Sequence, residues 1–405
     1  MVPAGRISSS SIGGQVARPG SNVQPRRCRS YNALLPAHSI RSRRPHLAAA
    51  LLLASYVAQC CWLIQQLPMS AEESCRAFPA SARQLQEMPA QPCESLRQYE
   101  SPLVAKMAEA APWRAISHVN PKIVLRLPFA AVGVLLGASL WIIAFRWYGG
   151  AGATLALALY CFSPPVVVAG SSVTPDLLAT WGFYGAVFLA VATAHALYAM
   201  PGSLGWWREW RNPLLFALAL AAGTAAQFWC VLALPFAFSY AIYLAPERRR
   251  EAALKLAAGC LGAAALFAAA CGFRPGQIAH VLASARFASF SLPFGNLHGG
   301  GAWWLPGAAI PFAIACCGWL ASRRMRHFSN TAPLLPAVAL MFLIPTTATA
   351  NPFRPWAQVW PFAAMFVGGV FADLMQGRYG RQWRAAAGAM SLAAAVLSLA
   401  TIHNI

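Results

Sequence analysis

The chain has 405 residues and a formal net charge of +20, yet only 10% of its residues are charged while 58% are hydrophobic. An average soluble domain carries about 25% charged residues, so this composition excludes an ordinary water-exposed surface. It indicates a membrane protein.

The first 46 residues precede every long apolar run and contain eight arginines, many serines and no acid. High charge with little apolar periodicity predicts a disordered basic cytoplasmic tail. A transit peptide shares this composition, but a plain cytoplasmic tail or a mis-assigned start codon is the simpler explanation. Residues 47–405 are expected to form a single transmembrane domain.

Apolar runs near the twenty residues that cross a bilayer core predict an all-α polytopic protein with about eleven spans. The two runs within 212–246 are joined by almost nothing polar, so they predict a tight helical hairpin or a misjudged boundary. The runs are 47–68, 123–146, 150–169, 177–199, 212–227, 229–246, 254–272, 302–322, 332–349, 356–376 and 385–403.

Cations predict the orientation, because Lys and Arg accumulate in cytoplasmic loops. With the N-terminus inside, the short inner connections hold thirteen and the short outer loops three, which places the C-terminus outside. The net charge therefore reflects topology and attraction to anionic lipids, and we expect no nucleic-acid partner. The inner cations are Arg146, Arg208, Arg211, Arg248, Arg249, Arg250, Lys255, Arg323, Arg324, Arg326, Arg378, Arg381 and Arg384.

The first outer loop, 69–122, is by far the longest connection and holds six of the eleven acids. Long loops in compact proteins are usually functional or disordered. Its spaced apolar residues predict short amphipathic helices on the outer membrane face. Cys75 and Cys93 lie in this loop, where an extracytoplasmic compartment permits a disulfide. No cysteine spacing indicates a metal site.

No Asp, Glu, Lys or Arg lies near the centre of a predicted span. Ion-coupled transporters usually place ionisable groups there, so this pattern disfavours a transporter. The polar groups gather instead at the outer interface, where an enzyme acting on a membrane-embedded lipid carrier needs them.

Four short motifs occur in order over about 65 residues, within VLRLPFAAVGVLLG and YGGAGATLALALYCFSPPVVVAGSSVTPDLLATWGFYGAVFLA. In their order and spacing they resemble the GT-C glycosyltransferases of the protein O-mannosyltransferase and aminoarabinose-transferase superfamily. Weaker similarity in ESPLVAKM, NLHGGGAWW and NPFRPWAQVWPF extends the resemblance over residues 47–376. The motifs are Arg126–Pro128, Gly149, Ser163–Pro164 and Thr174–Asp176.

The resemblance implies an inverting transfer of a sugar from a polyprenyl-phosphate carrier to a lipid, glycan or protein acceptor of the cell envelope. It implies a plasma (inner) membrane location in a bacterium and no redox cofactor; a divalent metal stays open. Such a reaction needs a carboxylate to deprotonate the acceptor hydroxyl and cations or amides to hold the departing phosphate.

The family's acidic pair follows the first helix, where this chain has Glu72 and Glu73. The family usually has Asp at the first position, and an extra methylene shifts a carboxylate by about an ångström, which bears on rate. Asp176 belongs to the resembling motif, although an acid in a first helical turn also stabilises the helix dipole. Glu100 is an additional candidate base.

Phosphate contacts are expected from Arg126, Arg354 and Lys106, with Arg274 and Arg286 as further outer cations. Arg grips phosphate in a bidentate fork, whereas snorkelling toward headgroups is the structural alternative. His298 lies in the outer loop 273–301, before three glycines and two tryptophans, a composition that suits a lid or an interfacial aromatic belt.

A further departure from the family pattern counts against the enzyme. Many members of the superfamily have a Lys after a Gly-rich run, and this chain has Gln227 near that place; the chain is also short for the superfamily. A non-catalytic subunit of this fold and a transporter or flippase of lipid-linked sugar therefore stand as alternatives to the enzyme.

Overall fold

The computed structural model describes residues 44–68, 121–199, 206–284, 305–321, 327–343 and 354–403. All regular elements within these ranges are helical. The helices are α1 (Arg44–Gln66), α5 (Pro121–Cys161), α6 (Pro164–Gly170), α7 (Asp176–Ala199), α8 (Trp206–Ala226), η4 (Phe228–Leu232), α9 (Ala233–Leu244), α10 (Arg249–Ala270), α11 (Pro275–Ser284), α12 (Leu305–Ala321), α13 (His327–Leu343), α14 (Arg354–Met375) and α15 (Gly380–His403).

Six of the described helices, α1, α5, α7, α10, α14 and α15, are long and apolar enough to cross a membrane. Shorter apolar helices cover Phe228–Leu244, Ala309–Ala321 and Phe328–Phe342. The prediction of an all-α membrane protein is confirmed. Each of the eleven apolar runs overlaps a described helix, but the runs 150–169 and 229–246 are each divided between two helices, and a count of about eleven spans is not confirmed.

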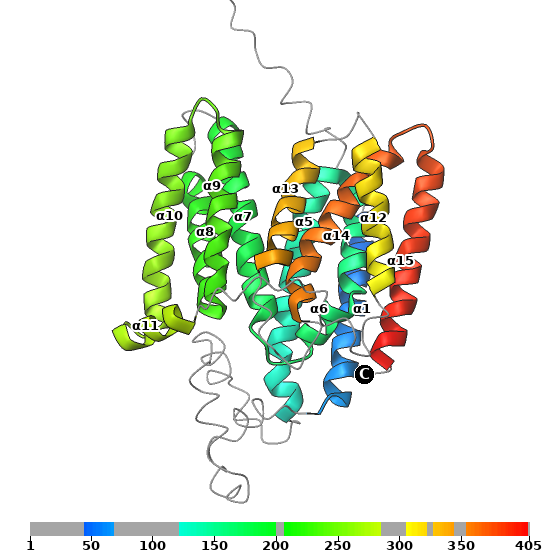
Figure 1. Ribbon diagram of the computed structural model, residues 1–405, viewed down its shortest axis with the longest axis horizontal. Helices are drawn as coiled ribbons and strands as arrows, with labels where there is room; N and C mark the ends of the chain where they lie inside the picture. Colours follow the sequence, from blue (N-terminus) through cyan, green and yellow to red (C-terminus); the bar gives the residue numbers. More distant parts are fainter. Residues whose placement is uncertain are drawn as a thin grey trace, which may run out of the picture. The chain divides into compact units, whose positions relative to one another are not determined.

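Helices α7 and α14 form the centre of the bundle. In their apolar segments 78% and 83% of the residues are buried, against 28% in α10 and 22% in α15. Figure 1 shows α10 and α15 at the two sides of the bundle. Their outward leucines, Leu261 and Leu392, are 75% and 68% exposed. A lipid environment accepts such side chains, because lipid tails are as apolar as leucine.

Helix α5 is two helices joined at Gly149. This residue has φ 79°, in the left-handed region that favours glycine. The Tyr160 hydroxyl donates to the Gly133 carbonyl over 2.7 Å, although 27 residues separate them. A straight helix would hold them about 40 Å apart, so the chain reverses between the runs 123–146 and 150–169.

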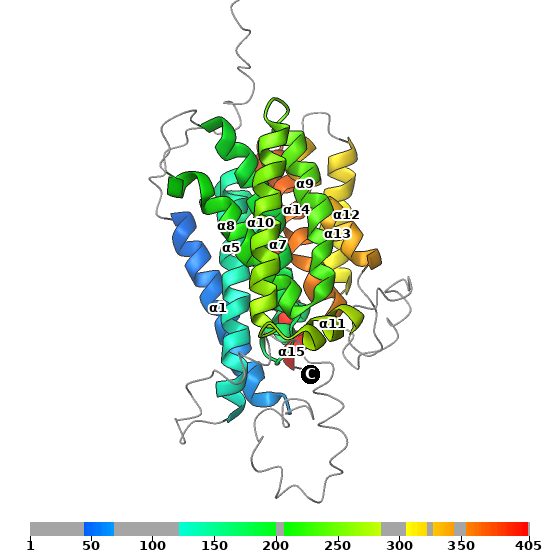
Figure 2. The same cartoon turned by 90° about the vertical axis from the view of Figure 1, so that its left-hand side faces the viewer.

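The runs within 212–246 form a helical hairpin. Near the start of α8, Asn212 donates to the carbonyl of Ala192, close to the end of α7. The helix ends at Ala226, and Gln227 takes an extended conformation before η4. After α9 the chain is back at the far end of α7, where Arg248 donates to the Leu197 carbonyl. Helix α8 therefore runs antiparallel to α7, and α9 runs parallel to α7 (Figure 2).

Glycine brings α7 and α8 into close contact. A Cβ atom on Gly182 would lie 2.4 Å from the Cα atom of Gly223, closer than real Cβ atoms approach. Small residues of this kind let membrane helices pack backbone to backbone. The close packing holds the end of α8, and with it Gln227, beside the start of α7.

Candidate functional site

Asp176 is the first residue of α7 and is only 1% exposed. The short helix α6 ends at Gly170, and residues 171–175 carry the chain across to α7. Within that turn the Ser171 hydroxyl donates to the Val167 carbonyl over 2.8 Å and lies 3.4 Å from the Cys60 carbonyl of α1. The turn thus lies against α1, and Asp176, which follows it, is buried in the bundle.

Two glutamine side chains bind the Asp176 carboxylate. The Nε2 atom of Gln227 donates to its Oδ1 atom over 2.8 Å, and the Nε2 atom of Gln358 donates to the same oxygen over 2.9 Å. Gln227 comes from the break between α8 and η4, and Gln358 lies in the first turns of α14. Three segments distant in the sequence therefore meet at one carboxylate.

An indole ring fixes the direction of the hydrogen bonds in this cluster. The Nε1 atom of Trp229 donates to the Oε1 atom of Gln227. Gln358 donates to the same Oε1 atom over 3.0 Å. An indole N–H can only donate, so Gln227 must present its oxygen to Trp229 and its nitrogen to Asp176. We call Asp176, Gln227, Trp229 and Gln358 the carboxamide cluster.

Two buried oxygen atoms, one in the cluster and one close to Asp176 in the chain, have no hydrogen-bond partner in the described structure. They are the Oε1 atom of Gln358, which is 2% exposed, and the Oγ1 atom of Thr174, two residues before Asp176. A buried polar atom without a partner costs about 1–3 kcal/mol of stability. Such an atom calls for an explanation, and a bound ligand or an ordered water provides one.

Arg126 is buried, at 2% exposure, and holds the end of α1. Its Nη1 atom donates to the carbonyls of Ile64 and Leu67 over 3.2 and 3.1 Å, and its Nη2 atom donates to that of Pro68 over 2.8 Å. The last carbonyls of a helix lack partners within it, so the guanidinium supplies them. Contact between Arg126 and a phosphate stays a prediction.

The other predicted site residues are outside what the structure describes. Arg354 is the first residue of α14, four positions before Gln358, but its side chain is not described. The residues wholly outside the described ranges are Glu72, Glu73, Glu100, Lys106, Arg286 and His298, together with Cys75 and Cys93. Arg274 is described and exposed, immediately before α11.

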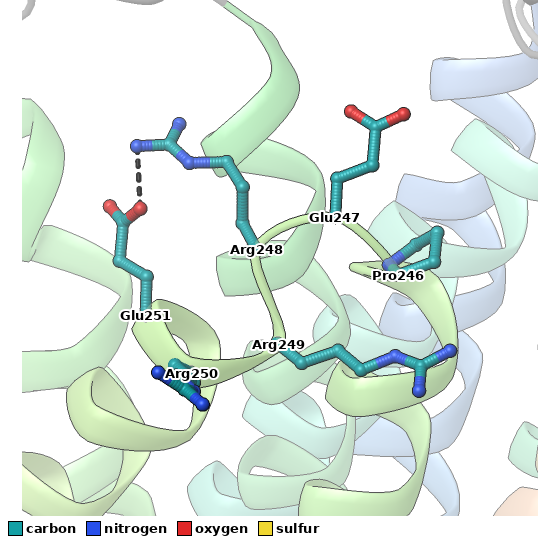
Figure 3. A pocket seen from close by; sticks show the side chains of 6 residues that line it. All are labelled: Pro246, Glu247, Arg248, Arg249, Arg250 and Glu251. Atoms are coloured by element: carbon teal, nitrogen blue, oxygen red, sulfur yellow. Dashed lines mark ion pairs between the residues drawn. The ribbon is translucent and has the colours of Figure 1, made fainter.

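The opposite end of α7 and α8 is charged. Lys255 is 8% exposed and pairs with Glu209 over 2.8 Å and with Glu251 over 3.2 Å. Arg248 pairs with Glu251 over 2.5 Å at an open hollow between α9 and α10 (Figure 3). The hydrogen bond from Lys255, and then its charge, lowers the pKa of the Glu209 carboxyl from its ordinary value of 4.5.

A smaller polar contact lies at the end of α14 remote from Gln358. The Nδ2 atom of Asn330 donates to the Oδ2 atom of Asp373 over 2.9 Å. Asn330 is fully buried, and its Oδ1 atom has no partner. Along α14, fifteen residues and therefore about 22 Å separate Asp373 from Gln358.

Sequence reasoning found part of the cluster. Asp176 was expected in the site, whereas Gln227 was noted only as a departure from the resembling superfamily and not as a site residue. Gln358 and Trp229 were missed. The available signal was a glutamine inside the otherwise apolar run 356–376, because a polar side chain in a buried helix needs partners. Among the described residues no three His, Cys, Asp or Glu side chains group as metal ligands would.

No family model matches this chain, and no curated protein or solved structure is significantly similar to it.

Proposed function

We propose that this protein is an inverting glycosyltransferase that moves a sugar from a polyprenyl-phosphate carrier to an envelope acceptor. One observation supports it above the others: the Asp176 carboxylate, from the motif that resembles the GT-C superfamily, is buried and oriented by two amide donors at 2.8 and 2.9 Å. An oriented carboxylate in a shielded place suits proton abstraction from a hydroxyl.

In this reaction the acceptor oxygen forms a bond to the anomeric carbon while the bond from that carbon to the phosphate oxygen breaks. The electron pair of the broken bond leaves on the polyprenyl phosphate, and the acceptor proton passes to a carboxylate. Asp176, Glu72 and Glu73 are the proposed carboxylates, with Glu100 as a further candidate base. Arg126, Arg354, Lys106 and His298 are the proposed substrate contacts.

Arg126 supports this arrangement through the path of the chain. By holding the Pro68 carbonyl at 2.8 Å, it fixes the point from which residues 69–122 leave α1. Glu72 and Glu73 follow Pro68 by four and five residues. Figure 1 shows the end of α1, the start of α5 and the start of α7 on the same side of the bundle. This supports the proposal that acids of the first loop and Asp176 act on one substrate.

The proposed orientation places the carboxamide cluster at the extracytoplasmic face of a bacterial plasma membrane. The charged end with Lys255 and Arg248, remote from Asp176, then faces the cytoplasm. This agrees with the rule that cytoplasmic loops are rich in Lys and Arg. A lipid-linked sugar would meet the site in the outer leaflet.

The test is transfer of radiolabelled sugar from polyprenyl-phosphate donors to endogenous acceptors in membranes that contain this protein. Asp176→Asn should lower transfer at least about a hundredfold if the carboxylate is the base. The asparagine oxygen can still accept from both glutamines, so the variant should fold. Glu72→Gln combined with Glu73→Gln tests the first loop, and Asn330→Leu in α13, next to the far end of α14, is the control.

Transfer by the wild type and by Asn330→Leu, but not by the carboxylate variants, is the expected result. Failure of the folded wild type to transfer any common lipid-linked sugar would contradict the proposal. It would then favour a non-catalytic subunit or a flippase, which need no proton acceptor.

A further inference from the structure

The hydrogen bonds of the carboxamide cluster run in one direction. Trp229 donates to Gln227, so the Gln227 oxygen faces the indole. That oxygen also accepts from the Nε2 atom of Gln358, whose other acceptor is Asp176. Both hydrogens of the Gln358 amide are therefore committed, and its Oε1 atom points away from both of these partners.

A Gln358 oxygen without a partner has a definite chemical requirement. A carbonyl oxygen can only accept, so a matching ligand group must donate an O–H or N–H. A phosphate oxygen is an acceptor and would also meet the Asp176 carboxylate close by. The position thus suits a hydroxyl and rejects an unprotonated phosphate.

The cluster is not wholly enclosed. Gln227, whose oxygen accepts from the Gln358 amide, is half-buried, so the cluster is partly exposed at this residue. Thr174, two residues before Asp176, is also half-buried, and its Oγ1 atom lacks a partner in the described structure.

We propose that the Oε1 atom of Gln358 accepts a hydrogen bond from a hydroxyl of the transferred sugar, and that Trp229 is the positioning residue that keeps this oxygen presented. This inference rests on the proposed function and names the sugar contact within the same site. Without the indole N–H the Gln227 amide can rotate, and the Gln358 amide can rotate with it.

The experiment measures binding to the full chain in lipid nanodiscs. The probes are farnesyl phosphate and farnesyl phosphate bearing mannose, glucose or aminoarabinose. The quantity of interest is the sugar increment, defined as the ratio of the Kd for the bare phosphate to the Kd for the sugar-bearing probe. It isolates the sugar contact from the phosphate and lipid contacts.

Gln358→Met keeps the length of the side chain and removes the acceptor, so it should lower the sugar increment about tenfold and leave the affinity for farnesyl phosphate unchanged. Trp229→Phe keeps a buried ring and both amide donors to Asp176. It should lower the sugar increment severalfold, and it is the variant to measure if Gln358→Met does not fold. Asn330→Leu removes another buried amide remote from the site and should leave the increment unchanged.

A series of deoxy sugars identifies the hydroxyl. One deoxy probe should bind the wild type as weakly as the complete sugar binds Gln358→Met, and that probe should not distinguish the two proteins. Such a match is expected for a direct contact and not for a general loss of structure.

A wild type with no sugar increment for any of the three sugars would overturn the inference, as would an increment that Gln358→Met and Trp229→Phe leave intact. The proposed function fails separately. Sugar transfer with an unaffected increment would retain the glycosyltransferase and reject the Gln358 contact. An increment that depends on Gln358, in a protein that transfers no sugar, would retain the contact and reject the enzyme.

Discussion

The Nε2 atom of Gln358 lies 2.9 Å from the Oδ1 atom of Asp176, although 182 residues separate them in the chain. The contact joins the first turns of α14 and α7, the two most buried long helices among those described. A hydrogen bond to a buried carboxylate is stronger than one between neutral groups. The position of the site and the packing of the bundle centre are therefore coupled.

Gln227→Lys should be more stable than Gln227→Leu by about 1–3 kcal/mol. Both changes remove the oxygen that accepts from Trp229, so the difference between the two variants reports on the contact with Asp176. The ammonium group of lysine can donate to the Asp176 carboxylate. With leucine, the carboxylate has one hydrogen-bond donor fewer. Thermal unfolding in detergent measures the difference. In an Asp176→Asn background the advantage of Lys should disappear, and its persistence would show that Lys acts elsewhere.

Arg126→Met should destabilise the protein by about 3 kcal/mol, because three carbonyls at the end of α1 lose a charged donor. Hydrogen exchange should increase at residues 64–68. Lys122→Met is the matched control, since Lys122 reaches the Leu67 carbonyl only at 3.5 Å, and it should cost much less. Equal effects of the two changes would contradict the role given to Arg126.

Gly182→Ala should destabilise the bundle by about 1–3 kcal/mol, because its Cβ atom would overlap the backbone of Gly223. Gly388→Ala in α15 is the control, since nothing lies within 4 Å of its Cβ position. There the loss of chain entropy in the unfolded state should leave the protein equally stable or stabilise it by about 0.5–1 kcal/mol. Unfolding temperatures in matched detergent decide the comparison.

The ion pair between Glu209 and Lys255 should depend on pH. Since Lys255 lowers the pKa of the Glu209 carboxyl from 4.5, the stability that the pair contributes is present above pH 4.5. It is lost as the pH falls through the lowered pKa. The difference in unfolding temperature between wild type and Lys255→Met should therefore be constant from about pH 7 to pH 5 and shrink below pH 4.5.

The exposed Arg250, which makes no ion pair in the described structure, provides the control for that measurement. Arg250→Met should change the unfolding temperature little at any pH, because exposed charges contribute little to stability. A difference between wild type and Lys255→Met that grows on acidification would reverse the assigned sign.

The helices could be predicted because each buries an apolar run long enough to see in the sequence. The turns between them involve single residues. Gly149, at which the chain reverses, lies between the apolar runs 123–146 and 150–169, as those runs predicted. Gln227, which follows the end of α8, has partners in α7 and α14 that the sequence does not reveal. Helix α11 was not predicted, since its ten residues follow the apolar run 254–272 and are too few to form a span.

The site was predictable only where a residue type carries chemistry by itself. Asp176 is such a residue. Gln358 and Trp229 act through geometry, and their neighbours lie 131 and 2 residues away in the chain. No spacing rule connects a glutamine in one helix with a glutamine in a distant break. For Arg126 the residue type suggested phosphate binding, but the structure shows its guanidinium bound to the carbonyl groups at the end of α1.

The two amide partners of Asp176 become available at different times during synthesis. At a synthesis rate of about 5–20 residues per second, Gln227 is added to the chain about 3–10 s after Asp176, and Gln358 about 9–36 s after Asp176. Between the addition of Gln227 and that of Gln358 the carboxylate has one glutamine partner, and the start of α7 is not yet joined to α14. A chain interrupted before residue 358 would therefore carry a half-partnered acid, which is a ready signal for membrane quality control.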